Sequence, residues 1–165
     1  MKKTLALEDY TARSLYKIAD SNFKTILEDT FGIDFFVTKL SDRIKTLGNV
    51  YNELNQIPLK ISDYLFLLEK DREQSLYIQY QLDIIKCFNQ GWKPDFTNIH
   101  EHKYYLWWER KRTGWLLGGV GICQYGNSAL GAGFYFKNRE DAAFCATQFK
   151  EIFTKTFYND EYIRR

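Results

Sequence analysis

The stretch KYYLWWERKR, residues 103–112, decides the fold class of this chain. The stretch WLLGGVGICQY, residues 115–125, follows it after Thr113-Gly114. Both stretches are rich in aromatic and aliphatic residues, and a short turn signal between two such stretches is typical of antiparallel strands. A third stretch of this kind, residues 129–137, follows a second turn signal at residues 126–128. The sequence therefore predicts a three-stranded antiparallel meander.

Helical patterns precede these strands. Apolar residues recur every three or four positions in residues 10–18, 21–31 and 72–89, which is the spacing of one buried helix face. Gly91 and Pro94 end the longest of these helices. Two shorter stretches are less regular: the apolar run 33–37 indicates a connector or a minor strand, and residues 62–68 indicate a short helix.

One more helix is predicted after the strands, over residues 139–157. Asn138 is placed to cap it, and Asp141 three residues later resembles a weak capping box. Phe149 and Phe153 lie on its apolar face, and we expect both rings in the core.

The order of helices, strands and one last helix favours an α+β fold over a parallel α/β fold. We expect the helices at 72–89 and 139–157 to cover one face of the meander. A length of 165 residues predicts a single domain, 1–165. Within it we distinguish a helical N-terminal part (1–60), the long helix, meander and C-terminal helix (61–158), and a polar tail (159–165).

The composition is that of a globular protein with an excess of aromatic residues. Apolar residues make up 45% and aromatic residues 18% of the chain, which excludes a disordered or low-complexity protein. Its three cysteines are widely spaced and indicate neither a disulfide framework nor a zinc motif. No signal-peptide pattern is present, and no apolar run approaches the ~18–20 residues that span a bilayer. We therefore expect a cytoplasmic protein without a membrane partner.

The charge distribution is only mildly informative. A formal net charge of +2 is too small to indicate nucleic-acid binding by itself. Residues 100–165 carry ten basic and seven acidic side chains, so the positive excess lies in the C-terminal part. Three of these cations are consecutive, at residues 110–112.

Three patterns resemble nucleotide-binding, metal-binding or catalytic motifs, but each lacks a required residue or spacing. The glycines of Gly118-Gly119-Val120-Gly121 lack the helix and third glycine of a dinucleotide loop, so they indicate a flexible or bulged strand. On a strand, His100 and His102 would point to one side, as metal ligands do, but no third ligand is identifiable, and a solvated loop before the first strand is the favoured interpretation. No His, Cys and carboxylate combination has catalytic spacing. We expect no cofactor and no metal; enzymatic activity stays open, and a non-enzymatic protein is favoured.

Residues 103–112 also form the best candidate for a binding surface. Alternate side chains of a strand face opposite ways, so both faces of this strand carry large rings. Either both faces are covered by other parts of the protein, or one exposes rings beside cations. An exposed surface of that kind stacks bases or anchors a protein partner. The predicted binding residues are Tyr105, Trp107, Arg110, Lys111 and Arg112.

Several segments carry a resemblance to a known group of proteins. They are residues 12–16, 23–32, 41–46, 89–96 with 103–105, and 136–138 running into the last helix. In these segments the chain resembles uncharacterised proteins common in phages, prophages and mobile elements of Bacteroidetes-type bacteria. That family has no assigned activity, so the resemblance implies no site residues. The chain departs from the pattern at Trp107-Trp108 and at residues 110–112, where a shorter and less basic segment is expected.

Together these observations favour a small non-enzymatic binding protein of a phage or mobile element, with an unidentified protein as its partner. The alternative is weak, sequence-tolerant nucleic-acid binding through the hairpin at 103–115. A small enzyme with an unrecognised site is the third hypothesis. The aromatic excess also predicts a homodimer with Trp107 or Trp108 near the contact.

Overall fold

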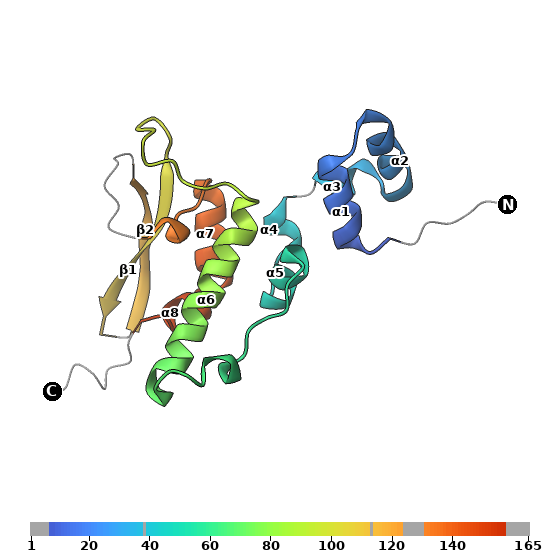
Figure 1. Cartoon of the computed structure of the whole chain (residues 1–165). Coiled ribbons are helices and arrows are strands. Elements are labelled where there is room, and N and C mark those ends of the chain that lie inside the picture. The colour runs from blue at the N-terminus through green and yellow to red at the C-terminus, as the bar shows by residue number, and fades with distance from the viewer. Residues whose placement is uncertain (1–6, 38, 113, 124–130, 158–165) are drawn as a thin grey trace.

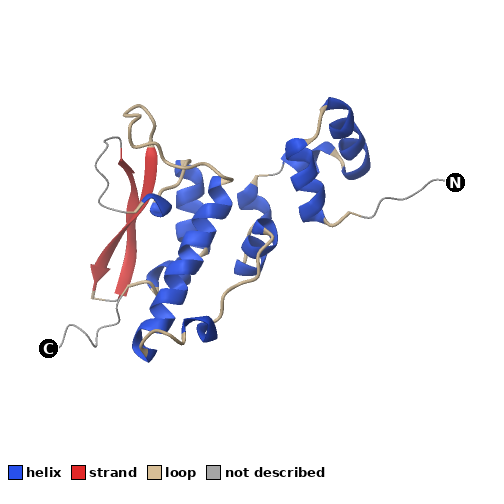
Figure 2. Cartoon of the chain, viewed as in Figure 1, coloured by secondary structure: helices blue, strands red, loops and turns tan. Residues whose placement is uncertain are grey.

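The computed structural model describes residues 7–37, 39–112, 114–123 and 131–157, which form helices and one β-hairpin (Figures 1 and 2). The polar tail predicted at 159–165 and the turn at 126–128 lie outside the described residues. The N-terminal helices are α1 (Asp9–Ile18), α2 (Ser21–Phe31), α3 (Ile33–Val37), α4 (Leu40–Arg43) and α5 (Leu47–Leu54). They are followed by the 3₁₀ helix η1 (Ile61–Tyr64), the long helix α6 (Glu69–Asn89), the strands β1 (Lys103–Lys111) and β2 (Gly114–Cys123), the 3₁₀ helix η2 (Ala132–Phe134), and the helices α7 (Arg139–Gln148) and α8 (Lys150–Thr154).

The long helix α6 occupies the centre of the molecule. In Figure 1 it runs between the hairpin on one side and α4 and α5 on the other. Its residues Ile84, Ile85 and Phe88 are buried together with Phe149 and Phe153, which confirms the predicted core positions of the two C-terminal rings. Helices α1–α3 lie beyond α4, on the side away from the hairpin (Figure 1). No helix among the described residues is long and apolar enough to cross a membrane.

Capping groups explain several helix ends. The carboxylate of Asp20 accepts a hydrogen bond from the Phe23 backbone N–H at 2.8 Å, so Asp20 is the N-cap of α2. Gln90 and Gly91 adopt positive φ and end α6 where the sequence predicts its end. The predicted cap Asn138 precedes α7, but its side chain donates to the Asp141 carboxylate instead of capping the backbone.

The predicted third strand is wrong. Within the described part of residues 129–137, residues 131–134 form the turn of η2, which the Phe134 backbone N–H closes by donating to the Gly131 carbonyl at 3.0 Å. Only one antiparallel bridge remains, between Tyr104 and Phe136, with backbone bonds of 3.0 and 2.7 Å. This bridge pairs residue 136 with β1 rather than β2. The sheet is therefore a two-stranded hairpin, and the meander order does not form.

Three other boundaries differ from the sequence expectation. Residues 33–37 form the helix α3, because a helical turn brings Phe35 and Phe36 together onto the ring of Phe31, whereas a strand separates neighbouring side chains. Residues 62–68 form only the end of η1 and a turn. The predicted helix 139–157 breaks at Phe149, whose φ of −111° and ψ of 25° lie outside the helical region.

Candidate functional site

The two strands pair in an antiparallel register with one bulge. Trp107 pairs with Gly119 and Trp108 with Leu117, so Gly118 is an extra residue on β2. The inward side of β1 packs on the C-terminal helices: the Trp108 ring stacks on Phe153 with centroids 6.3 Å apart and meets Phe157 at 6.2 Å. This face of the hairpin is therefore covered.

The outward side carries both aromatic members of the predicted binding residues. Trp107 is 55% exposed, while Tyr105 is half-buried with its ring 6.1 Å from that of Tyr135. Both rings lie over glycines of β2. A Cβ on Gly118 would be 2.6 Å from Trp107 Cδ1, and one on Gly121 would be 2.6 Å from Tyr105 Cε1. The glycine run thus makes room for these rings and confirms the bulged-strand interpretation.

The predicted cations are split between the two sides of the hairpin. Lys111 lies on the outward side and forms an ion pair of 2.6 Å with Glu109, whose pKa is lowered by the hydrogen bond and charge of this lysine. Arg110 lies on the other side, with its guanidinium 5.8 Å above the Trp115 ring. Arg112 is exposed beyond the end of β1. Trp107 therefore lies on the same side of the hairpin as Lys111, whose charge is paired with that of Glu109, while Arg110 lies on the opposite side. The five predicted binding residues do not share one face.

Lys103, at the start of β1, is fully buried, and neighbouring oxygen atoms hold its ammonium group. Its ammonium donates to the carbonyl oxygens of Asn98 and Glu101 at 3.1 and 2.9 Å and lies 3.3 Å from the Glu101 carboxylate. That carboxylate also accepts from the Trp92 indole and the Asp95 backbone N–H. These contacts tie the loop between α6 and β1 together.

The groups considered for metal or nucleophilic chemistry do not form a site. His100 and His102 are exposed, and within the described ranges no three His, Cys, Asp or Glu side chains gather as metal ligands. Cys87 and Cys145 are buried in the core, and burial raises the pKa of the Cys87 thiol to about 12. Such a thiol is almost entirely protonated at neutral pH and is a poor nucleophile.

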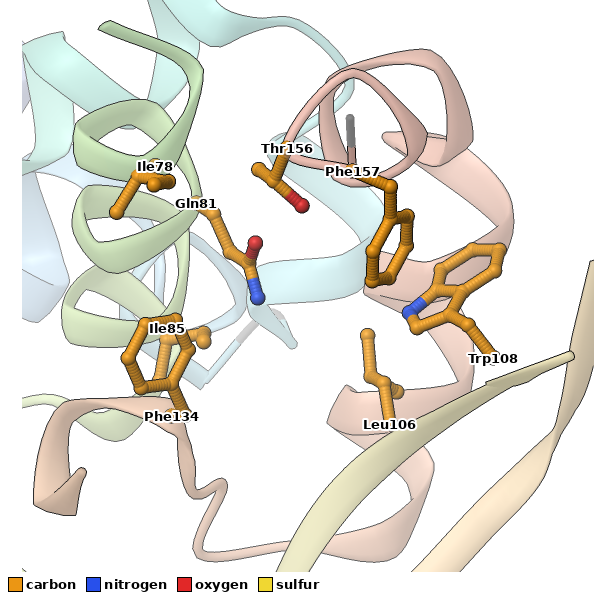
Figure 3. A pocket seen from close by; sticks show the side chains of 8 residues that line it. All are labelled: Ile78, Gln81, Ile85, Leu106, Trp108, Phe134, Thr156 and Phe157. Atoms are coloured by element: carbon orange, nitrogen blue, oxygen red, sulfur yellow. The ribbon is translucent and has the colours of Figure 1, made fainter. Parts of the chain in front are cut away.

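Figure 3 shows a cavity between α6, the hairpin and the C-terminal residues. It has a volume of about 240 Å³, and its walls include Leu106, Trp108 and Phe157. Among the described lining residues, Gln81 and Thr156 contribute polar side chains and none is titratable. Ligand pockets usually enclose roughly 300–1,000 Å³ and combine apolar walls with several placed polar groups. This cavity is smaller than that range.

A stronger feature lies between α5 and α6. Residues 57–68, which we call the apolar segment, expose six large aliphatic or aromatic side chains: Ile57, Leu59, Ile61, Leu65, Phe66 and Leu68. Ile57 is 86% and Phe66 80% exposed. This exposed surface is not predicted from the sequence, where residues 62–68 indicate only a short helix. The available signal was the run of four apolar residues at 65–68, too dense for one face of a short helix.

Hydrogen bonds to neighbouring elements hold the backbone of the apolar segment. The Tyr80 hydroxyl donates to the Leu59 carbonyl at 2.7 Å. Arg72 donates through Nε to the Leu67 carbonyl at 3.0 Å and through Nη2 to the Leu65 carbonyl at 3.2 Å. The segment is therefore tied to α6 by its backbone while its apolar side chains face solvent.

Comparisons with protein-family models, with curated proteins and with solved structures each found no match to this chain.

Proposed function

We propose that this chain is a non-enzymatic protein-binding module that docks a partner protein with its apolar segment. The observation that carries the proposal is the exposure of six large apolar side chains within twelve residues, on a backbone held by Tyr80 and Arg72. Burying one such side chain contributes roughly 1.5–3 kcal/mol, so covering several of them supplies a substantial driving force for association. Contiguous apolar patches on soluble proteins usually mark interfaces.

The chemistry of the segment favours a protein over a nucleic acid. Its charged residues are only Lys60 and Asp63, which cancel. Binding to a phosphate backbone depends on several cations that displace counterions, and the segment does not supply them. The backbone hydrogen bonds to Leu59, Leu65 and Leu67 pre-order the segment, which reduces the entropy lost on binding. The phage-family resemblance makes a protein of the host or of the mobile element the expected partner.

Site-specific photo-crosslinking tests this proposal in cells of the organism that encodes the chain. A photoreactive residue replaces Phe66 in one variant and the exposed Lys86 on α6 in the control. We expect one dominant protein adduct at position 66 that is lost when Leu65 is also changed to Ser. An adduct with a second copy of the chain would show self-association through the apolar segment, a contact other than the homodimer predicted near Trp107 or Trp108. Equal adduct patterns at positions 66 and 86 would contradict docking through this segment.

The second candidate function is weak nucleic-acid binding by the hairpin at 103–115. The observation in its favour is the 55% exposed Trp107 ring near the cations of the hairpin end. Stacking on such a ring adds ~1–3 kcal/mol per base, and three phosphate contacts give a log–log salt slope near −2 for single strands. Fluorescence anisotropy with a labelled single strand measures this slope. Binding that survives Trp107→Ala together with Arg110, Lys111 and Arg112→Ala would rule out the hairpin.

A further inference from the structure

A second feature, unrelated to the apolar segment, lies where the N-terminal helices meet the rest of the molecule. A cavity of about 270 Å³ is lined by four basic side chains: Arg13 and Lys17 of α1, Lys24 of α2, and Arg43 of α4. Its remaining walls are Tyr16, Phe36 and Gln90, so no carboxylate of the described side chains lines it. We call it the basic pocket.

Aromatic rings, rather than carboxylates, hold two of these cations in place. The Arg13 guanidinium lies 3.9 Å from the Phe35 ring centroid and donates to the Phe35 carbonyl oxygen. The Lys24 ammonium lies 5.4 Å from the Tyr16 ring centroid. Tyr16 in turn stacks on Phe36 with centroids 4.1 Å apart. A cation held on a ring face keeps its full positive charge, because the ring contributes only a quadrupole.

Two cations of the basic pocket have no ion-pair partner among the described residues, namely Lys17 and Lys24. Arg43 differs, because Glu53 accepts two hydrogen bonds from its guanidinium. Glu28, outside the described lining, accepts a hydrogen bond from the Tyr16 hydroxyl. Burial and the neighbouring Arg43 charge lower the pKa of Arg13, while the charges of Glu53 and Asp9 oppose that shift only in part.

Arg43 also carries an unused hydrogen-bond donor. Its Nη atoms bind Glu53, but its buried Nε has no hydrogen-bond partner. A buried donor without an acceptor is unfavourable. Guanidinium groups bind tetrahedral oxyanions with short, charge-assisted hydrogen bonds.

We infer that the basic pocket binds a phosphate group through Arg13, Lys17, Lys24 and Arg43. An adjoining hollow of about 650 Å³ shares Phe36 and Gln90 with the pocket. Its charged lining residues among the described part of the chain are Lys39, Lys137, Glu140 and Asp141, so their formal charges balance. This hollow leaves room for the remainder of a phosphate-bearing ligand. That ligand is either a small phosphorylated molecule or a single nucleic-acid strand that enters by one of its phosphates.

The test uses the whole chain and two probes. Calorimetry with pyrophosphate measures binding of a small phosphate, and anisotropy with a labelled twelve-nucleotide thymidine strand measures binding of a strand. The test variant is Lys17→Gln with Lys24→Gln, because neither lysine forms an ion pair with a described residue. The matched control is Lys150→Gln, an exposed lysine on α8 that lies outside the pocket lining. Thermal unfolding shows that each variant is folded.

We expect binding of at least one probe, weakened about tenfold or more by the double substitution and unchanged by the control. Pyrophosphate binding would identify a small ligand, and binding of the strand alone would identify a nucleic acid. Failure of both probes at low salt would overturn the inference. Binding that Lys150→Gln weakens as much as the double variant, or that only Trp107 and hairpin substitutions remove, would overturn it as well. Neither result bears on docking by the apolar segment, which the crosslinking experiment tests separately.

Discussion

The ring of Tyr105 on β1 lies over the backbone of Gly121 on β2, in a space that a β-carbon would fill. The same ring contacts Tyr135, which follows η2. The contact between Tyr105 and Tyr135 thus joins the hairpin to the segment that the sequence predicts as a third strand. Since Gly121 has no side chain, Tyr105 can hold this position and the outward face of the sheet is partly closed.

Gly121→Ala should destabilise the protein by about 1 kcal/mol, because the new methyl group displaces the Tyr105 ring. Chemical denaturation measures the change. Gly131→Ala is the control: its nearest neighbour would be 3.6 Å away, so the reduced freedom of the unfolded chain should make it neutral or stabilising by ~0.4–1 kcal/mol. In a Tyr105→Ala background the Gly121 substitution should lose its cost. A cost that persists there would show that Tyr105 is not the cause.

Lys103→Met should cost about 3–5 kcal/mol, because it removes a buried ammonium from two carbonyl oxygens and from Glu101. Lys111→Met removes an exposed ion pair on the same strand and should cost less than about 1 kcal/mol. The free energies of unfolding of the two variants are compared in urea. Similar values for both would show that the loop between α6 and β1 does not depend on Lys103.

Alanine substitutions of two phenylalanines should distinguish a loss of stability from a loss of partner binding. Phe153 is fully buried, and Phe153→Ala should lower the free energy of unfolding by about 3–5 kcal/mol. Phe66 is 80% exposed, so Phe66→Ala should change it by no more than ~0.5 kcal/mol. The Phe66 variant should nevertheless lose the partner adduct captured through a photoreactive residue at position 65. A large stability loss in the Phe66 variant would mean that the apolar segment packs on its own chain.

Alkaline pH should weaken the folded state through Cys87. Burial raises the pKa of its thiol to about 12, whereas the thiol of the unfolded chain titrates near its ordinary value of 9.0. The unfolded state therefore releases this proton first, so the stabilising contribution is complete below about pH 9 and declines as pH rises toward 12. Burial also raises the pKa of Tyr51, which acts in the same direction. Urea midpoints at pH 8 and pH 10.5 should differ less in Cys87→Ala than in the unchanged protein. Equal differences would exclude Cys87 as a contributor.

The sequence by itself determined the local elements. Alternating rings and a Thr113-Gly114 turn signal predict the hairpin, helical spacing predicts α6, and Gly91 predicts its end. The burial of Phe149 and Phe153 also followed from the helical pattern. These features depend on neighbours within a few residues, which a sequence pattern records directly.

Tertiary structure alone decided the pairing of residue 136 with β1, the burial of Lys103 and the exposure of the apolar segment. It also brought Arg13 and Arg43, thirty residues apart in the sequence, to one pocket. Each of these depends on which distant surfaces meet and compete for burial. Residues 62–68 are rich in apolar side chains, but the core is formed by other elements, and Leu65, Phe66 and Leu68 are exposed. The physical reason is that periodicity reports which side chains can be buried together, whereas the packing of remote elements selects which of them are buried.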